Sequence, residues 1–257
     1  MLLYYSGTGN TRYVAETLSK QLDEPLYSVT SSDPASLSFS GKSLGFLFPI
    51  YSWGVPPIVL DFIHHLNDRF IKDIKGLDVW MCCTCGDETG KAPEMFIKAF
   101  RKKGIIAKGA WSVIMPNNYV LLSGFDIDPI DVQRRKLDAV LPRLNEIADK
   151  IRSGIMERDV VTGSFPALRS AVYPLFVRFG INPDKWTASD ACVSCAKCVE
   201  VCPADNIRIE KGRPVWDANC LSCCACYHYC PSHAIRYGKA TRGKGQYFFK
   251  PSNLSDV

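Results

Sequence analysis

The sequence lacks several features that would place it outside the ordinary globular proteins. It has no uninterrupted apolar run long enough to span a bilayer. Its first residues, Met1 to Gly7, have neither the basic start nor the long apolar stretch of a secretory signal, so they predict a first strand instead. No charge sign dominates strongly, since 31 Lys and Arg against 26 Asp and Glu leave a formal +5. At 257 residues and 47% hydrophobic, the chain is expected to form one full domain and a smaller one.

Cysteine is abundant by contrast, and most of it follows one pattern. Eight of the twelve cysteines form two copies of CxxCxxCxxxCP: Cys192, Cys195, Cys198 and Cys202 before Pro203, and Cys220, Cys223, Cys226 and Cys230 before Pro231. This spacing is typical of a pair of [4Fe-4S] clusters. Zinc is the alternative, although zinc knuckles use paired CxxC sequences and four ligands. Because ligand cysteines must stay thiolates, we expect a reducing compartment and assign the chain to the cytoplasm.

The two motifs are copies of one segment, aligned without gaps at an offset of 28 residues. In such tandem motifs the fourth cysteine binds the other cluster. We therefore assign Cys192, Cys195, Cys198 and Cys230 to one cluster, and Cys220, Cys223, Cys226 and Cys202 to the other. A segment of about fifty residues buries too little surface to fold alone, so removing iron is predicted to unfold residues 188–237. Cys224 falls outside the spacing, and His228 and His233 are expected at the surface or shielding a cluster.

The first part of the chain alternates between strands and helices. Short apolar runs predict buried strands at residues 2–5, 44–50, 77–84 and 105–115. Amphipathic helices lie between them, one ending at Gly104 and the last running from Pro129 to Ile151, with Asp128 as its N-cap and a kink at Pro142. This order indicates a doubly wound parallel α/β sheet.

Four regions follow from these patterns. Residues 1–154 are expected to form the α/β domain, and 188–237 the cluster domain. Residues 155–187 are too rich in aromatic side chains for a free linker, and we interpret them as a packed connector. Residues 238–257 are interpreted as a tail that is solvated or wraps the surface, with a docking patch for an acidic partner as the alternative.

The loop after the first strand has the composition of a phosphate-binding turn. It reads Ser6, Gly7, Thr8, Gly9, Asn10, Thr11, and it is neither GxGxxG nor a loop with the lysine of GxxxxGK[ST]. Hydroxyls, an amide and close backbone N–H groups at a helix N-terminus suit the terminal phosphate of a mononucleotide. The alternative is a turn without a ligand.

Two further loops follow later strands, at the edge where open α/β sheets bind ligands. The first has aromatic side chains that could stack on a flat ring, and its candidate site residues are Pro49, Tyr51, Ser52, Trp53 and Gly54. The second contributes Thr84, Cys85, Gly86, Asp87 and Gly90. Asn118 and Tyr119, after the next strand, are expected to form a wall or lid. Cys82, Cys83 and Cys85 could form a redox-active thiol set, but Cys82 and Cys83 fit a buried strand better, which leaves Cys85, in its loop, as the candidate.

These motifs together resemble a known family. Ser6, Thr8, Gly9 and Thr11 match the [ST]xTGxT phosphate loop of flavodoxins, which bind FMN. The whole chain resembles a flavodoxin fused to a bacterial-type two-cluster ferredoxin, an architecture of iron-sulfur flavoproteins from anaerobes. The resemblance implies a flavodoxin-like five-stranded parallel sheet, a small α+β ferredoxin domain, and FMN with two [4Fe-4S] clusters.

Three functions are compatible with these cofactors. The first is intramolecular electron transfer between the clusters and FMN, in a carrier that serves redox protein partners. The second is a flavin-dependent reductase of a small organic substrate, for which only Asp87, Glu88 and Tyr119 offer acid-base groups. The third is a redox sensor. Clusters and a flavin phosphate would bring the net charge to about −1, which argues against nucleic acid as a partner.

Overall fold

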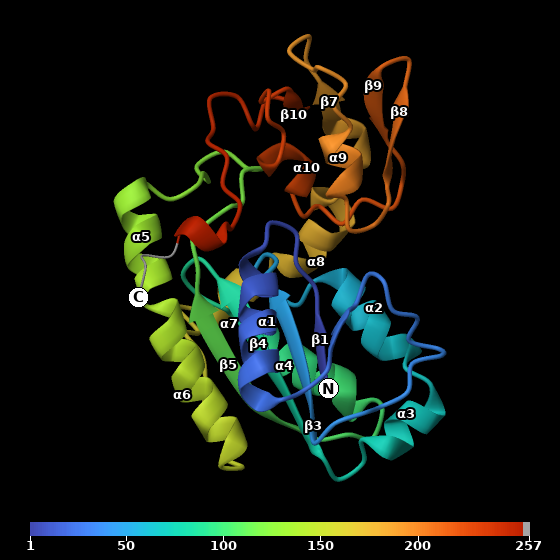
Figure 1. The fold of residues 1–257 in the computed structure, drawn as a ribbon, viewed down its shortest axis with the longest axis vertical. Helices are drawn as coiled ribbons and strands as arrows, with labels where there is room; N and C mark the ends of the chain where they lie inside the picture. The colour runs from blue at the N-terminus through green and yellow to red at the C-terminus, as the bar shows by residue number, and fades with distance from the viewer. Residues whose placement is uncertain (254–257) are drawn as a thin grey trace.

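The computed structural model describes residues 1–253, which form a large lobe built on one sheet and a small cysteine-rich lobe beside it (Figure 1). The sheet has six parallel strands in the order β2-β1-β3-β4-β5-β6. Its strands are β1 (Leu2–Tyr4), β2 (Leu26–Ser28), β3 (Ser43–Pro49), β4 (Asp78–Cys85), β5 (Ala107–Ile114) and β6 (Arg158–Asp159). No helix within residues 1–253 is long and apolar enough to cross a membrane.

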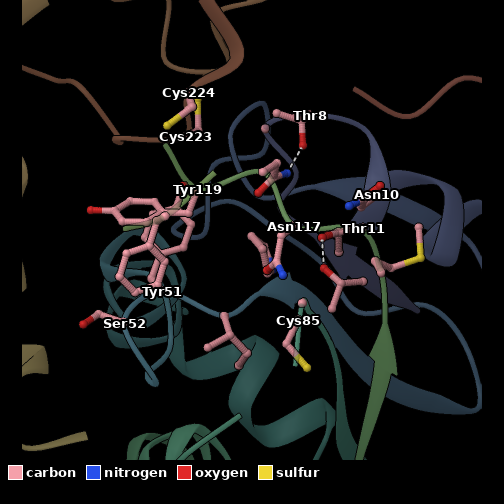
Figure 2. Close-up of a pocket in the computed structure, with 18 of the residues that line it drawn as sticks. Thr8, Asn10, Thr11, Tyr51, Ser52, Cys85, Asn117, Tyr119, Cys223 and Cys224 are labelled. Atoms are coloured by element: carbon pink, nitrogen blue, oxygen red, sulfur yellow. Dashed lines mark hydrogen bonds between the residues drawn. The ribbon is translucent and has the colours of Figure 1, made fainter. Parts of the chain in front are cut away.

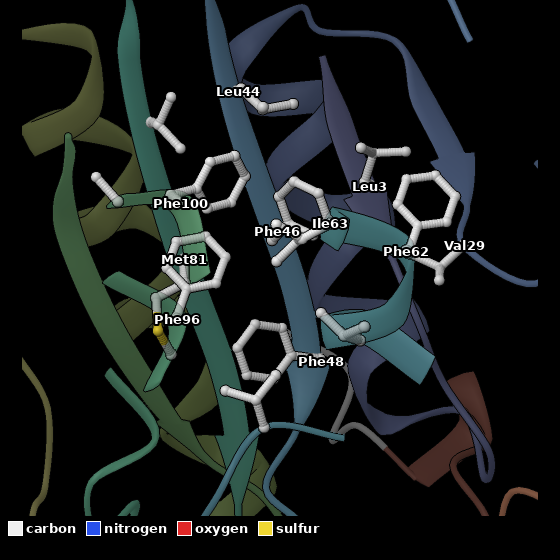
Figure 3. Close-up of a cluster of buried hydrophobic side chains, with 14 of the residues drawn as sticks. Leu3, Val29, Leu44, Phe46, Phe48, Phe62, Ile63, Met81, Phe96 and Phe100 are labelled. Carbon is white, nitrogen blue, oxygen red and sulfur yellow. The ribbon is translucent and has the colours of Figure 1, made fainter. Parts of the chain in front are cut away.

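Helices cover both faces of this sheet. They are α1 (Asn10–Leu22), α2 (Pro57–His65), α3 (Asp68–Asp73), α4 (Ala92–Arg101), α5 (Ile130–Asp138) and α6 (Val140–Arg152). Alternation along β1 sends Leu2 into the core beneath α1 and α6, and Leu3 into the core beneath α2 and α4. The second core is rich in phenylalanine, with Phe46 edge-on to Phe62 and Phe100 (Figure 3). The predicted doubly wound parallel fold is therefore confirmed.

Two details of the large lobe differ from the sequence-based prediction. The sheet has six strands, because β6 pairs with β5 through a backbone hydrogen bond from Ala110 N to Glu157 O (2.9 Å). The predicted helix from Pro129 is split at Ala139, between α5 and α6. Pro142 has no N–H for the carbonyl of Asp138, four residues earlier, and its ring crowds that carbonyl, which explains the interruption at Ala139.

The N-cap prediction is also shifted. Pro129 occupies the cap position of α5, and the Asp128 carboxylate accepts hydrogen bonds from the backbone N–H of Asn117 (2.8 Å) and from Lys136 (2.8 Å). Burial alone would raise the pKa of Asp128, but these hydrogen bonds outweigh it and lower the pKa. Asp128 therefore joins α5 to the loop after β5.

The region predicted as a connector serves both lobes. It begins with β6 and continues through α7 (Pro166–Ser170), α8 (Tyr173–Leu175), a π-turn at Phe176–Gly180 and a 3₁₀ turn, η2 (Pro183–Lys185). Its inner side chains pack on the large lobe, where Tyr173 donates a hydrogen bond to Val55 O (2.5 Å). Its last residues open β7 of the small lobe.

The cysteine-rich lobe contains only short elements. They are β7 (Trp186–Ala188), α9 (Lys197–Glu200), β8 (Ile207–Glu210), β9 (Arg213–Trp216), α10 (Ala225–His228) and β10 (Ile235–Tyr237). Two antiparallel pairs, β7 with β10 and β8 with β9, frame the two short helices. The lobe lies over the carboxyl ends of the large sheet's strands (Figure 1).

The described part of the predicted tail runs along the surface, with Lys239, Arg242 and Lys250 exposed and Tyr247 buried. Residues 238–253 run back from the small lobe to the glycine loop, and Tyr247 is only 4% exposed. A 3₁₀ turn, η3, covers Pro251–Asn253. The last four residues of the predicted tail lie outside the described residues.

Candidate functional site

A cavity of about 330 Å³ lies at the carboxyl ends of β1, β3, β4 and β5 (Figure 2). All but three of the residues expected to hold the flavin line it, namely Ser6, Gly7, Thr8, Asn10, Thr11, Pro49, Tyr51, Ser52, Trp53, Thr84, Cys85, Gly86, Asp87, Asn118 and Tyr119. The other three are glycines that face protein. A methyl group on Gly9 would lie 3.0 Å from Phe249 Cβ, on Gly54 2.3 Å from the Tyr173 ring, and on Gly90 2.5 Å from Trp53 Cβ.

The glycine loop keeps one hydroxyl free for a ligand. Thr11 Oγ1 is 2.7 Å from Thr84 Oγ1, and Asn10 Nδ2 donates to Pro116 O (3.1 Å). Thr8 Oγ1 accepts from Asn118 Nδ2. Ser6 Oγ, in contrast, is buried without a hydrogen-bond partner among the described residues. A buried hydroxyl left unpaired costs about 1–3 kcal/mol, so this position fits a ligand that provides the partner.

The turn after β3 is strained in a way that holds Trp53 at the wall of the cavity. Ser52 and Trp53 have φ of 45° and 58°, a left-handed conformation that costs non-glycine residues on the order of 1 kcal/mol each. Tyr51 and Gly54 close the turn with two backbone hydrogen bonds of 3.0 and 2.9 Å. Such strain persists only where surrounding contacts impose it.

Two charged residues provide those contacts. Trp53 Nε1 donates to Glu88 Oε1 (2.6 Å), and Arg169 of α7 pairs with the same carboxylate and lies 5.7 Å from the centre of the Trp53 ring. Sequence reasoning named Glu88 only as an acid-base candidate. It missed Arg169, because no local pattern brings α7 to this loop.

An aromatic wall forms another side of the cavity. Tyr51 and Tyr119, both labelled in Figure 2, each contact Phe176 edge-on, at 6.1 and 6.4 Å between ring centres. Tyr51 Oη is 2.9 Å from the buried Tyr5 Oη. Burial raises the pKa of both tyrosines well above the ordinary value, so both are neutral hydroxyls.

The prediction that Cys85 lies in the loop after the strand is wrong. Cys85 is the last residue of β4 and only 8% exposed. Burial raises the pKa of its thiol to about 12, although Lys136 acts in the opposite direction. The thiol is therefore protonated near neutral pH and lacks the thiolate that a reactive cysteine needs. The following Gly86 gives Asn117 room, since a methyl group there would overlap the Asn117 amide.

The cysteine motifs gather into two groups. Cys192, Cys195, Cys198 and Cys230 line one small cavity together. In the other group, burial raises the pKa of the Cys223 thiol to about 12, and the nearby thiols of Cys202 and Cys220 add to the shift. No three His, Cys, Asp or Glu side chains among the described residues lie close enough to hold one ion. The four thiolates of a cubane lie farther apart than the ligands of a single metal ion, because each thiolate binds a different iron.

Both motifs have the same backbone. Left-handed residues recur at the offset of 28, with Ser194 matching Ser222, Ala196 matching Cys224, and Asp205 matching His233. Backbone N–H groups point at the fourth cysteine of each copy, from Asn206 to Cys202 Sγ and from Ala234 to Cys230 Sγ, both at 3.3 Å. Each loop thus wraps its sulfurs with strained backbone and N–H donors.

Two indole groups of the lobe face the second cysteine group. Trp186 Nε1 and Trp216 Nε1 are buried and make no hydrogen bond of normal geometry among residues 1–253, although each lies near a thiol of this group. Burial raises the pKa of the Cys220 and Cys226 thiols. The N–H of Trp186 acts in the opposite direction and lowers the pKa of Cys220, and the N–H of Trp216 lowers that of Cys226. Both N–H dipoles are therefore oriented to favour negative charge on these sulfurs.

The two sites share a wall. Ser222, Cys223 and Cys224 line the large cavity from above, as Figure 2 shows for the two cysteines. Gly7 permits this contact, because a methyl group on it would lie 2.7 Å from Cys223 Cβ and 2.8 Å from Cys223 O. Cys195, in the first group, is exposed at the surface.

His228 is buried at the junction of the lobes, whereas His233 is exposed. The Nδ1 atom of His228 accepts from Tyr247 N (3.1 Å), and its Nε2 atom donates to Asn118 O (2.6 Å). Burial lowers the pKa of His228 to about 4, so a neutral ring makes both hydrogen bonds. Its role is to join the two lobes.

Comparison with known proteins agrees with this geometry for the large lobe. Residues 1–113 match the flavodoxin domain family. The flavodoxin of Nitratidesulfovibrio vulgaris (strain Miyazaki F) is 34% identical over 94 residues, which are 35% of this chain and 63% of that protein. The chain thus spans less than two thirds of its length.

Two solved structures align with more than half of this chain at low sequence identity. Rubredoxin oxygen:oxidoreductase from the anaerobe Desulfovibrio gigas aligns with 60% of this chain and 35% of its own, at 11% identity and a TM-score of 0.42. A short-chain flavodoxin associated with a bacterial microcompartment aligns with 60% of this chain and 96% of its own, at 18% identity and a TM-score of 0.41. Residues 1–113 form a flavodoxin domain, and the sheet has the strand order 2-1-3-4-5 of that fold, to which β6 adds a strand from outside the matched residues.

Proposed function

We propose that this chain transfers electrons between two [4Fe-4S] clusters and one FMN, and acts as an electron carrier for redox protein partners. The observation that carries the proposal is the contact of Cys223 with Gly7, which joins the cysteine-rich lobe to the wall of the flavodoxin-domain cavity. Clusters supply single electrons, and a flavin stores one or two. The residues on the two sides of this contact would hold these groups next to each other.

Three observations support FMN in the large cavity. More than half of the lining residues lie within residues 1–113, which match the flavodoxin domain family, and the lining follows the carboxyl ends of the strands. The unpaired Ser6 Oγ and the first N–H groups of α1, which lack intrahelical partners, suit a phosphate. The aromatic wall of Tyr51 and Tyr119 suits a flat ring system.

Support for the clusters comes from the arrangement of the cysteines. Cys230, the fourth cysteine of the second motif, lines a cavity with the first three of the first motif, as the proposed ligand sets require. Left-handed backbone at matched positions in both motifs is strain that bound clusters would impose. Burial also raises the pKa values of the Cys223 and Cys226 thiols. Thiolates this close together are costly to form unless a metal binds them.

The proposed ligand sets give the two clusters different places. The set with Cys223 lies against the cavity and would exchange electrons with the flavin. The set with Cys195 includes an exposed ligand and would face a redox partner. An electron would therefore cross the molecule through surface cluster, inner cluster and flavin, in a direction decided by their reduction potentials.

The size and charges of the cavity favour a carrier over a substrate reductase. A volume of about 330 Å³ is near the lower end of the roughly 300–1,000 Å³ found for ligand pockets, so FMN leaves little room for a second molecule. The carboxylates that could act in catalysis are already paired, Asp87 with Asn117 and Lys136, and Glu88 with Trp53 and Arg169.

An anaerobic optical and EPR titration of the purified protein, with iron and flavin quantified, tests this function. We expect one FMN, about eight irons per chain and two cluster signals. Cys223→Ser should remove or convert the signal of the inner cluster, whereas Cys224→Ser, its neighbour outside the motif, should leave both. A preparation without flavin, or a cluster signal equally sensitive to both substitutions, would contradict the assignment.

A further inference from the structure

We propose that Lys244–Phe249, here called the C-terminal strap, is part of the FMN site: it fixes the phosphate-binding loop and makes FMN retention depend on the folded cysteine-rich lobe. The inference rests on the proposed function. No local pattern in the sequence marks these six residues as a binding element. Their contacts do so, because they touch all three segments that meet at the phosphate end of the cavity.

The strap holds the glycine loop from outside the cavity. Tyr247 Oη donates to Asn10 Oδ1 (2.8 Å), and the N–H of Phe249 donates to Thr8 O (2.8 Å). The Phe249 ring stacks on Tyr13 of α1, with 4.5 Å between ring centres. Phe249 also occupies the space beside Gly9, where any side chain would collide with it. The loop and the start of α1 are therefore pinned by residues that come more than 230 positions later.

The same strap is fastened to the cysteine-rich lobe. Tyr247 N–H donates to His228 Nδ1 (3.1 Å), and Gln246 Nε2 donates to Cys230 O (3.1 Å). The hydroxyl of Tyr227 donates to Lys244 O (2.8 Å). All three partners lie in or next to α10, within the second cysteine motif. Loss of structure in that motif would therefore release the strap.

The strap also anchors the segment that closes the cavity beside Asn118. Lys244 Nζ donates to Val120 O (2.8 Å), and the N–H of Gly245 donates to Asp126 Oδ1 (3.0 Å). Because Asn118 Nδ2 in turn donates to Thr8 Oγ1, the strap supports the phosphate loop from two sides.

This arrangement couples two binding events. A phosphate loop binds tightly only when its N–H groups and hydroxyls are held in one geometry, and the strap holds them only while α10 is folded. Clusters that order the second cysteine motif would thus strengthen FMN binding. By linkage, FMN would stabilise the cysteine-rich lobe against cluster loss by the same factor.

A comparison of FMN with riboflavin, which lacks the phosphate, tests the strap in the full-length anaerobic holoprotein. Tyr247→Phe removes one buried hydrogen bond to Asn10, and Phe249→Ala removes the ring that stacks on Tyr13. Each substitution should raise the FMN dissociation constant about tenfold, which is the effect of losing one buried hydrogen bond. The riboflavin dissociation constant should stay within about twofold of the wild-type value, because the ring sites are untouched. Phe179→Ala is the matched control, because Phe179 is 61% exposed and lies outside both the strap and the cavity lining.

Iron chelation provides the second readout. In the wild type it should release FMN, whereas in Tyr247→Phe/Phe249→Ala it should cause little further loss, because the coupling is already broken. Equal weakening of FMN and riboflavin, or unchanged FMN binding in both strap variants, would overturn the strap proposal while leaving the proposed function intact. A wild-type protein that binds neither flavin would overturn the proposed function as well.

Discussion

Replacing Gly7 with alanine probes the contact that brings the inner cysteine group to the flavin cavity. The added methyl group would lie 2.7 Å from Cys223 Cβ and 2.8 Å from Cys223 O. Carbon atoms pack best at about 3.5–4.0 Å, so the two loops must separate by nearly 1 Å. Both obstacles are backbone or first side-chain atoms, which cannot rotate away.

The size of the effect follows from the packing. Forcing an extra methyl group into a close-packed contact costs about 1–3 kcal/mol, which corresponds to about 5- to 150-fold in the docking equilibrium of the two loops. Gly7 does not have a positive φ, so the whole cost comes from the overlap and none from backbone strain. Leu221 and Cys223, which pack on the core of the flavodoxin domain, would be lifted from it.

Two measurements report this separation. Hydrogen exchange should accelerate at residues 6–9 and 220–224, and stopped-flow reduction of the flavin by the reduced clusters should slow. Gly104→Ala is the control, because Gly104 has a φ of +74° and no neighbouring atom within 4 Å. It costs about 1 kcal/mol of backbone strain without touching the interface. If Gly7→Ala matched this control in both measurements, the shared wall would not be the route between the sites.

Three further predictions follow from the same structure. Removing iron should unfold residues 188–237 and leave the large sheet intact, as checked by far-UV circular dichroism and hydrogen exchange; native protection of that segment in the iron-free protein would refute it. Trp216→Phe removes an N–H oriented toward Cys226 and should lower the reduction potential of the inner cluster by about 40 mV, because such donors favour the more negative reduced state. An EPR-monitored redox titration measures it, and an unchanged or raised potential would speak against the role. Tyr51→Phe leaves the Tyr5 hydroxyl buried and unpaired, which should cost about 1–3 kcal/mol, whereas Tyr5→Phe/Tyr51→Phe should cost less than the two single changes added together. Urea unfolding decides between this outcome and simple additivity.

Local patterns predicted most of the large lobe, because its elements are set by short-range chemistry. Continuous apolar runs marked β3 and β4, since strands covered on both faces need no polar side. Gly104 and Pro129 marked helix ends through backbone preferences that need no partner. The two-residue β6 escaped prediction, because Arg158 and Asp159 have no apolar pattern and are held by pairing with β5.

The site residues also divide into those that local sequence patterns predicted and those that they did not. The glycine loop and the cysteine motifs were visible because each places several ligand groups within a few residues. Cys85 was misplaced because one residue decides whether a thiol ends a buried strand or begins a loop. Arg169 gave no local signal, since its partner Glu88 lies 81 residues away.

The sequence by itself determined which segments are candidates to bind cofactors: a glycine-rich loop at the start of an α/β domain and two cysteine motifs in tandem. Only the tertiary structure decided how they are joined. The contact of Gly7 with Cys223 and the path of the strap from α10 to Thr8 and Asn10 depend on surfaces brought together by packing across the whole chain. Such contacts have no sequence period, because they are fixed by the shape of the folded lobes and not by the conformational preferences of neighbouring residues.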